Sequence, residues 1–303
     1  MTTDLRLGTR ASALALWQTN WVVEQLRRLY PDVDVEVVPI KTLGDAAWAE
    51  PLSQLGKGVF VNEIEQALLR CEIDLAVHSL KDLPTEQPQG LAIAAVPPRE
   101  DARDALVSRL GASLATLPRG ASVGTSSPRR AAQLLAARPD LRVGSLRGNL
   151  DTRLRKAVID FDAIVVAVAG LLRLGMAGRI TEILPVEVCT PAVGQGALAI
   201  ETRATDDSVY ALLQPLDDGP TRTAVAAERA LLQRLGGGCH VPVGAIAQVS
   251  GALLTLQAVV AHASGNPCLR DTLSGDAADP AALGYRLAEA LIAAGADRLL
   301  DAR

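Results

Sequence analysis

Aromatic side chains are scarce in this sequence, where they make up 3% of 303 residues. Proteins that bind nucleic acids usually combine a basic surface with rings that stack on the bases. Here acidic residues outnumber basic ones, 34 to 30, and the formal net charge is -4. The composition therefore argues against a nucleic-acid partner, although it leaves room for a local basic cleft.

Cysteine is also scarce, and its spacing matches no disulfide scaffold. The four cysteines are far apart, without a CxxC pair, and are Cys71, Cys189, Cys239 and Cys268. This pattern is typical of reduced thiols in the cytosol rather than of a zinc site. The three histidines, His78, His240 and His262, also lack metal-ligand spacing, so we expect no metal.

Signals for membranes and for nucleotides are absent too. Residues 1–4 lack the basic start and apolar block of a signal peptide, and the longest strongly apolar run, 163–172, is too short to span a bilayer. We therefore expect a soluble, cytoplasmic protein with no membrane partner. There is no Walker A pattern, and Gly194-Gln195-Gly196 alone is too short for a dinucleotide fingerprint.

The sequence does contain short apolar runs that alternate with helical periodicity. Strands are predicted at 5–8, 33–40, 75–77, 91–96, 122–124, 141–144 and 163–167. Such alternation is typical of parallel, doubly wound α/β sheets, which bind ligands at the carboxyl ends of their strands. A last block, from about Asp218, has two predicted strands, 243–249 and 253–261, and a helix over 280–294. That order predicts a smaller α+β domain.

One segment with polar, potentially catalytic residues follows the predicted strand 75–77. There the Asp82 carboxylate can stabilise a cation or hold a polarised N–H group, and Lys81 can pair with an anionic ligand. A surface Lys-Asp pair in a loop would give the same pattern and contribute little. Before this segment, residues 43–58 show little pattern and predict a mobile loop that contains Lys57.

A second block starts near Asp104, and two neighbouring strand ends in it carry hydroxyls and arginines. Ser127 is predicted to cap a helix that begins at Pro128. The polar residues after the two strands are Thr125, Ser126, Ser127, Arg129 and Arg130, then Arg147 and Arg153, with Arg155 a weaker candidate. Clustered arginines repel one another unless an anion neutralises them, which favours a ligand with several carboxylates. A capped helix with a solvated basic turn remains the alternative. Arg10, Ser12, Lys57 and Arg173 can join from other elements.

A cysteine follows three consecutive glycines, between a predicted helix at 221–235 and the strand at 243–249. Glycine permits close approach of another group, and the thiolate of Cys239 is a nucleophile able to carry a group covalently. A helix that ends at glycine, followed by a small buried cysteine, is the alternative.

Six segments, in this order, resemble the porphobilinogen deaminase (hydroxymethylbilane synthase) family. They are 10–18 (RASALALWQ), 56–60 (GKGVF), 78–84 (HSLKDLP), 125–130 (TSSPRR), 146–149 (LRGN) and 237–239 (GGC). The likeness covers nearly the whole chain and is weakest in the last domain outside the cysteine loop. Three positions depart from residues common in the family: Leu43 replaces Arg, Leu55 replaces Gly, and Thr202 replaces Cys. The first two belong to the loop, and none removes a proposed catalytic residue.

The resemblance implies a transferase that condenses four porphobilinogen molecules head to tail, with loss of ammonia, onto a covalently bound dipyrromethane primer. Hydrolysis would then release hydroxymethylbilane. By resemblance, Cys239 would hold the dipyrromethane cofactor through a thioether, and Asp82 would be the catalytic carboxylate near the pyrrole nitrogens. Gln195 matches a position that lines the same cleft. Positions that match binders of acetate and propionate side chains are Arg10, Ser12, Lys57, Lys81, Thr125, Ser126, Ser127, Arg129, Arg130, Arg147, Arg153 and Arg173.

The resemblance also implies a monomer with three domains. Two lobes would resemble type II periplasmic binding proteins, the first formed by 1–98 and 197–216 and the second by 102–194. The α+β domain, 218–303, would carry Cys239, and we expect a positively lined cleft between the lobes. A non-enzymatic bilobal anion-binding protein is an alternative, but it would not require Asp82 and Cys239 together. A cysteine hydrolase using Cys239 with His240 is another, although sequence neighbours seldom form such a dyad.

Overall fold

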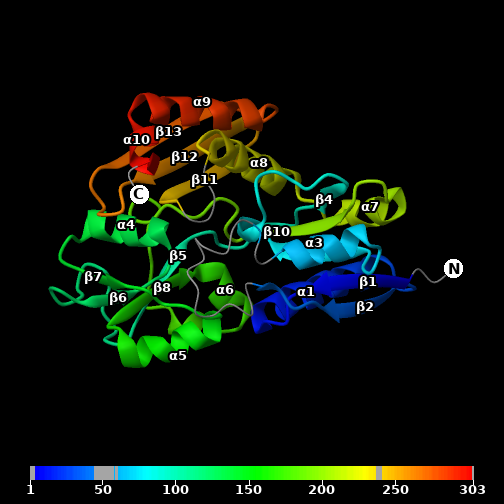
Figure 1. The fold of residues 1–303 in the computed structure, drawn as a ribbon, viewed down its shortest axis with the longest axis horizontal. Coiled ribbons are helices and arrows are strands. Elements are labelled where there is room, and N and C mark those ends of the chain that lie inside the picture. Colours follow the sequence, from blue (N-terminus) through cyan, green and yellow to red (C-terminus); the bar gives the residue numbers. More distant parts are fainter. Residues whose placement is uncertain (1–3, 44–57, 59–60, 237–240, 302–303) are drawn as a thin grey trace. The chain divides into compact units, whose positions relative to one another are not determined.

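The computed structural model describes residues 4–43, 58, 61–236 and 241–301. The chain divides into two compact units (Figure 1). Unit 1 consists of Met1–Arg99 and Ala197–Arg222, and unit 2 of Glu100–Gly196 and Thr223–Arg303. The chain therefore leaves unit 1 and later returns to complete it. In the described part of the chain, no helix is both long enough and apolar enough to span a bilayer.

Unit 1 is built on a five-stranded sheet in the order β2-β1-β3-β10-β4. The first three of these strands run parallel, whereas β10, contributed by the returning chain, is antiparallel to both β3 and β4. Helices α1 and α7 pack on one apolar face of the sheet, and α3 packs on the other. The elements are β1 (Asp4–Thr9), α1 (Ala13–Leu29), β2 (Asp34–Pro39), α3 (Asn62–Leu69), β3 (Leu75–Ser79), β4 (Leu91–Ala95), β10 (Leu198–Arg203) and α7 (Asp207–Leu213).

Unit 2 contains a second five-stranded sheet, in the order β7-β6-β8-β5-β9. Strands β6, β7 and β8 are parallel, and β5 is antiparallel to β8 and β9. Helix α4 packs on one face of the sheet, and α5 and α6 pack on the other, which makes the sheet doubly wound. The elements are β5 (Asp104–Ser108), β6 (Ser122–Gly124), α4 (Pro128–Ala137), β7 (Arg142–Gly144), α5 (Leu150–Asp160), β8 (Ala163–Ala167), α6 (Val168–Arg173) and β9 (Glu182–Ile183).

Unit 2 also contains a smaller α+β part with a three-stranded antiparallel sheet. Its apolar core joins the sheet to three helices. The elements are α8 (Gly219–Arg234), whose first four residues belong to unit 1, β11 (Val243–Ser250), β12 (Leu253–Ala261), β13 (Cys268–Asp276), α9 (Pro280–Ala293) and α10 (Ala296–Asp301). The sequence predicted only two strands here, which is wrong. Strand β13 is an edge strand whose residues are mostly exposed and polar, so it lacks the apolar alternation that marks its neighbours.

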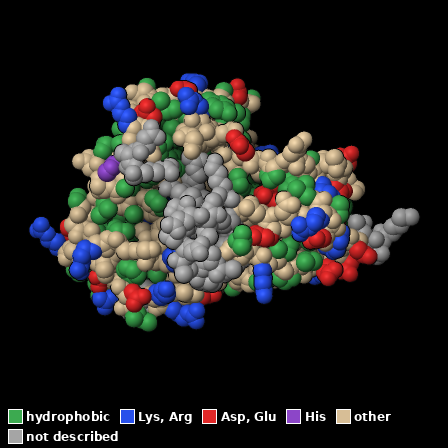
Figure 2. All heavy atoms as spheres, in the orientation of Figure 1, with side chains coloured by type: hydrophobic (Ala, Val, Ile, Leu, Met, Phe, Trp, Pro, Cys, Tyr) green, Lys and Arg blue, Asp and Glu red, His purple; other side chains and the backbone are tan. Residues whose placement is uncertain are grey.

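The predicted fold class is confirmed: two α/β sheets with helices on both faces, plus a smaller α+β part. The sheets are mixed rather than wholly parallel, because β5 and β10 run against their neighbours. Residues Glu100–Gly196 and Thr223–Arg303 fall in one compact unit, so the predicted boundary between the second lobe and the last domain stays a prediction. On the face shown in Figure 2, Lys and Arg side chains are interspersed with Asp and Glu, in keeping with the small net charge.

Candidate active site

The predicted catalytic carboxylate, Asp82, lies directly after strand β3 in unit 1. Strands β1 and β3 are parallel neighbours, so their carboxyl ends lie at the same edge of the sheet. The chain passes from β1 to Arg10 and Ser12, and from β3 into the short helix η2 (Leu80–Asp82), which includes Lys81. The fold of unit 1 therefore brings four predicted site residues to one edge.

Backbone hydrogen bonds hold the turn that bears Asp82. The N–H of Leu80 donates to the carbonyl of Ala197 at 3.0 Å, which continues the pairing of β3 with β10. The N–H of Leu83 donates to the carbonyl of Leu80 at 3.2 Å and closes the turn. Asp82 is half-buried, and within the described ranges no hydrogen bond or ion pair engages its carboxylate. The carboxylate is therefore available to a ligand.

Helix α1 begins at the same edge, and Ser12 caps it. The Ser12 Oγ accepts the N–H of Ala15 at 3.3 Å, which leaves the hydroxyl proton able to bond to an anion. The first turn of α1 has no acidic residue, and a helix N-terminus favours negative charge. Gln18 donates to the Ser79 Oγ at 2.9 Å, which fastens α1 to the end of β3.

In unit 2, three parallel strand ends meet at another edge. Strand β6 lies between β7 and β8 and is parallel to both. The residues that follow these strands are Thr125, Ser126 and Ser127 after β6, Arg147 after β7, and Arg173 in α6 after β8. The sheet therefore gathers the hydroxyls and arginines that the sequence placed at strand ends.

The predicted start of helix α4 is confirmed. The Ser127 Oγ accepts the N–H of Arg130 at 3.4 Å, and Pro128 is the first helical residue. The Ser126 hydroxyl donates to the carbonyl of Leu146 at 2.8 Å. This bond joins the segment after β6 to the segment after β7, so the two polar segments are adjacent, as expected.

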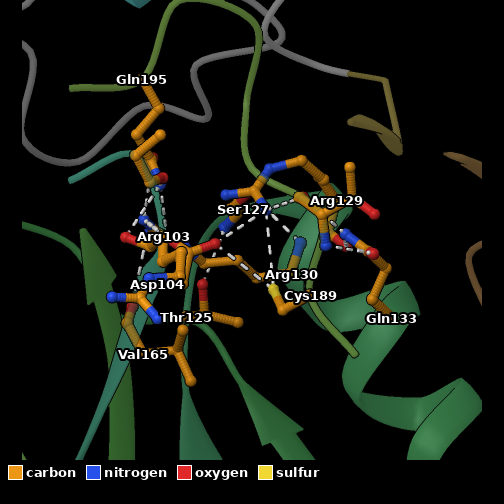
Figure 3. A network of polar contacts seen from close by, with 12 residues as sticks. Arg103, Asp104, Thr125, Ser127, Arg129, Arg130, Gln133, Val165, Cys189 and Gln195 are labelled. Atoms are coloured by element: carbon orange, nitrogen blue, oxygen red, sulfur yellow. Dashed lines mark hydrogen bonds and ion pairs between the residues drawn. The ribbon is translucent and has the colours of Figure 1, made fainter. Parts of the chain in front are cut away.

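Arg129 and Arg130 are both buried, and both contact one carboxylate, Asp104 (Figure 3). Asp104 opens strand β5 opposite Ala167, the last residue of β8, so it lies at the edge where β8 ends. Its oxygens lie 2.8 Å from Nη1 of Arg129 and 2.6 Å from Nη2 of Arg130. Arg129 also donates to the carbonyl of Thr190 at 2.6 Å. The arginine pair is thus held in place from inside unit 2.

The protonation of Asp104 follows from these contacts. Burial by itself would raise the pKa of the Asp104 carboxyl, but the charges of Arg129 and Arg130 outweigh it and hold the pKa well below its ordinary range. One carboxylate between two guanidinium groups leaves one positive charge in this buried network. The sequence predicted that a ligand neutralises the pair, and it missed the internal counter-ion. Binding of a ligand carboxylate by the pair stays a prediction.

Gln195 and Cys189 complete the surroundings of Asp104 (Figure 3). The Gln195 Nε2 donates to the Asp104 Oδ1 at 2.8 Å and to the carbonyl of Ala102 at 2.7 Å. The Cys189 Sγ donates to the other carboxylate oxygen at 3.3 Å, and burial raises the pKa of this thiol to about 12. Gln195 is turned inward in this network, and its predicted place in a ligand cleft stays a prediction.

The arginines after β7 differ in exposure. Arg147 and Arg153 are half-buried, and Arg153 donates to the carbonyl of Gly148 at 2.7 Å, which orders the turn before α5. Arg155 is exposed and lies near the hydroxyl of Thr152, at 3.5 Å. This exposure agrees with its ranking as the weaker candidate.

Arg173 is buried at the end of α6. Its Nη2 donates to the carbonyl of Gly196 at 2.7 Å. Burial lowers the pKa of Arg173 to about 10, and the negative charge of Glu100 partly offsets that effect. The guanidinium remains charged at neutral pH.

Two predicted site residues, Lys57 and Cys239, lie outside the described residues, as does most of the predicted loop, including Leu55. Their roles stay predictions. Within the part of the chain that the structure describes, no group of three or more His, Cys, Asp or Glu side chains could hold a metal ion.

Comparison with known proteins identifies the family. Residues 5–211 match the family model described as porphobilinogen deaminase, dipyromethane cofactor binding domain, and residues 222–293 match that of the porphobilinogen deaminase C-terminal domain. A porphobilinogen deaminase of Syntrophotalea carbinolica is 54% identical over 300 residues, covering 98% of this chain and 95% of the relative. One of Geobacter metallireducens is 52% identical over 299 residues, covering 98% and 94%.

Among solved structures, the methionine binding protein MetQ matches with a TM-score of 0.45 and 14% identity, covering 70% of this chain and 89% of that chain. The two family models together match residues 5–211 and 222–293, and both relatives match nearly the full length of the chain. This chain belongs to the porphobilinogen deaminase family, whose cofactor is a dipyrromethane.

Proposed function

We propose that this chain condenses four porphobilinogen molecules head to tail, with loss of ammonia, onto a dipyrromethane primer and releases hydroxymethylbilane by hydrolysis. The observation that carries the proposal is the available carboxylate of Asp82 at the edge where β1 and β3 end. Arg10, Ser12 and Lys81 supply cationic and hydroxyl groups at the same edge. Membership of the porphobilinogen deaminase family supports this reaction over a non-enzymatic anion-binding role.

Cys239 is the proposed attachment point of the primer, through a thioether. When bound, the primer supplies a free pyrrole carbon to which the first substrate is joined. A dipyrromethane offers pyrrole N–H donors and carboxylate side chains. The described residues fit these groups: Asp82 offers an acceptor, and Ser12 with the start of α1 offers donors to an anion.

Asp82 acts on the charge that develops during the reaction. Loss of ammonia from porphobilinogen leaves a cation that is conjugated with the ring nitrogen. A carboxylate beside that nitrogen stabilises the cation, and it can accept the proton released when the aromatic ring is restored. Because Asp82 is half-buried, water screens this interaction less than it would on an open surface.

The arginines and hydroxyls bind the carboxylates of substrate and primer. Each added pyrrole brings two carboxylates, so a single arginine pair would not suffice. Arg129 and Arg130 share Asp104 and together provide one net positive charge. The remaining proposed binders are Arg10, Ser12, Lys57, Lys81, Thr125, Ser126, Ser127, Arg147, Arg153 and Arg173, with Gln195 beside them.

The proposal includes a monomer in the cytoplasm that acts on small molecules, without nucleic-acid or membrane partners. The acidic composition argues against a nucleic-acid partner, and the dispersed cysteines support a cytoplasmic location. It also includes three domains, with the first formed by 1–98 and 197–216, the second by 102–194 and the third by 218–303. The separate family models for residues 5–211 and 222–293 support a distinct last domain.

Intact-mass spectrometry tests the reaction and its primer together. The active enzyme is expected to carry extra mass equal to two linked pyrrole units, and Cys239→Ala is expected to show the bare polypeptide mass. A matched Cys268→Ala variant is expected to keep the extra mass, because Cys268 lies on strand β13. An active enzyme with no added mass would refute the primer.

A further inference from the structure

Three ionisable side chains are buried together in unit 1, and one of them lies on the strand that leads into the turn with Asp82. They are Glu65 on α3, His78 on β3 and Glu201 on β10, which are 5%, 5% and 0% exposed. The Nε2 of His78 lies 3.2 Å from Oε2 of Glu201. We call these three residues the carboxylate–histidine cluster.

The strand register explains why the cluster forms. His78 lies opposite Ala199, and Glu201 lies opposite Ala76, so His78 and Glu201 project from the same face of the sheet. Helix α3 covers that face, and Glu65 belongs to its buried side. The hydrophobic cluster buried in this contact is apolar, so three buried ionisable groups beside it require an explanation.

The cluster is poorly satisfied by hydrogen bonds. Within the cluster, the buried side-chain atoms without a hydrogen-bond partner are Oε1 of Glu65, Nε2 of His78 and both carboxylate oxygens of Glu201. The Nε2 of His78 therefore lies close to a carboxylate oxygen of Glu201 without the alignment of a hydrogen bond. Buried carboxylates that lack donors are costly when ionised, so the cluster is most stable when its negative charge is kept low.

Glu65 changes its charge near neutral pH. Burial raises the pKa of the Glu65 carboxyl to about 7, the negative charge of Glu201 adds to this effect, and His78 opposes it. When the proton leaves Glu65, a second negative charge appears beside Glu201 in a contact that excludes water.

The other charged groups on α3 and on the elements packed against it either bind partners other than Glu65 or are exposed. Among the described residues these are Asp4 and Arg6 on β1, Arg203 on β10 and Glu63 on α3, whereas β4 has none. Arg6 and Arg203 both pair with Asp74, at 3.0 and 3.2 Å. Glu63 accepts a backbone N–H at 3.1 Å, and Asp4 is exposed. None of these contacts compensates a new charge on Glu65.

We propose that the carboxylate–histidine cluster positions the turn that carries Asp82, and that loss of the proton on Glu65 loosens this turn. His78 lies on β3, four residues before Asp82 in η2, and the N–H of Leu80 donates to the carbonyl of Ala197, just before the strand that carries Glu201. Repulsion between Glu65 and Glu201 would push α3 away from β3 and β10. The cluster residues act through Asp82 and touch no reacting atom, so the inference rests on the function proposed for Asp82.

The test compares pH profiles of turnover for the wild type, Glu65→Gln and a matched control, Glu63→Gln on the same helix. Glutamine has the shape of protonated glutamate and cannot ionise. The ratio of kcat for Glu65→Gln to that of the wild type is expected to stay near one at about pH 6 and to rise about fivefold by about pH 8.5. The ratio of KM should stay flat, because Asp82 acts on the developing charge. A flat kcat ratio for Glu65→Gln would overturn the inference, as would an equal rise for Glu63→Gln.

Hydrogen exchange of the full-length wild type supplies a readout that does not depend on activity or on the folding of a variant. After correction for the intrinsic effect of pH, peptides that cover residues 62–69 and 78–83 should exchange faster above about pH 7 than below it. Unchanged protection across that range would contradict the inference.

The Asp82→Asn variant separates the two proposals. Normal turnover of this variant would refute the role of Asp82. An inactive Asp82→Asn together with a flat kcat ratio for Glu65→Gln would refute only the role proposed for the cluster.

Discussion

The two units each place an aspartate at a sheet edge where parallel strands end, but the surroundings of these residues differ. Asp82 of unit 1 is half-buried, and no bond to its carboxylate is found among the described residues. Asp104 of unit 2 is fully buried and is bound by Arg129, Arg130, Gln195 and Cys189. The same side chain is therefore available for chemistry in one unit and serves as a fixed counter-ion in the other. Burial and partners, not residue type, decide which role a carboxylate has.

The largest expected effect comes from the available carboxylate. Asp82→Asn keeps the size of the side chain and removes its charge, so it should lower kcat by roughly 10² to 10⁴ while the fold stays intact. Porphobilinogen consumption measures the first effect, and circular dichroism with thermal unfolding measures the second. Near-normal consumption would show that Asp82 is not the catalytic group.

Substitution of the buried, paired carboxylate, Asp104, should lower the stability of the fold, whereas substitution of Asp82 should lower activity and leave the fold intact. Asp104→Asn leaves two buried guanidinium groups without a counter-ion, so the free energy of unfolding should fall by about 3 to 5 kcal/mol. Denaturant unfolding measures this loss. Asp101→Asn is the control, because Asp101 pairs with the exposed Arg103, and we expect it to cost less than about 1 kcal/mol. Equal losses for the two variants would show that Asp104 does not hold the arginine pair.

A third buried carboxyl group, that of Glu65, should make the stability of the chain depend on pH. Its pKa in the folded chain is about 7, above the ordinary value of 4.5, so the folded state holds this proton more tightly than the unfolded state. The free energy of unfolding should therefore fall as the pH rises from about 4.5 to about 7 and stay low above that. Glu65→Gln should raise Tm by about 2 to 4 °C at about pH 8 and leave it nearly unchanged at about pH 5. A Tm difference independent of pH would contradict the raised pKa.

The smallest expected effect concerns two arginines near one another in the sequence. Arg147→Gln removes a half-buried cation near the end of β7 and should raise KM about tenfold with little change in kcat. Arg155→Gln removes an exposed cation on α5 and should change KM by less than about twofold. Steady-state kinetics on both variants checks this contrast. A similar KM for the two variants would remove Arg147 from the proposed binders.

Local features of the fold were predictable from the sequence. Strands at 122–124, 163–167 and 253–261 agree with β6, β8 and β12, and the cap by Ser127 before Pro128 is confirmed. These features depend on alternation of apolar residues or on turn chemistry within a few positions. Strand β13 was missed, because an exposed edge strand needs no apolar face.

The partners of buried charges were not predictable in this way. Asp104 was read only as the start of a new block, because its arginines come from a helix far along the chain and only the sheet brings them together. Likewise, His78 and Glu201 meet through the register of β3 with β10. A charged residue that opens or interrupts an apolar run, as both Asp104 and Glu201 do, is the signal that could have been used.

The insertion of β10 between β3 and β4 has a consequence for biosynthesis. A nascent chain that has left the ribosome as far as Ile183 already contains every strand of the five-stranded sheet of unit 2. At that stage β4 has no neighbour among the described strands of its sheet, because β10 lies between it and β3. The amino-terminal unit must therefore finish folding after its successor has been synthesised, and any premature stop before Leu198 would leave β3 and β4 with exposed edges.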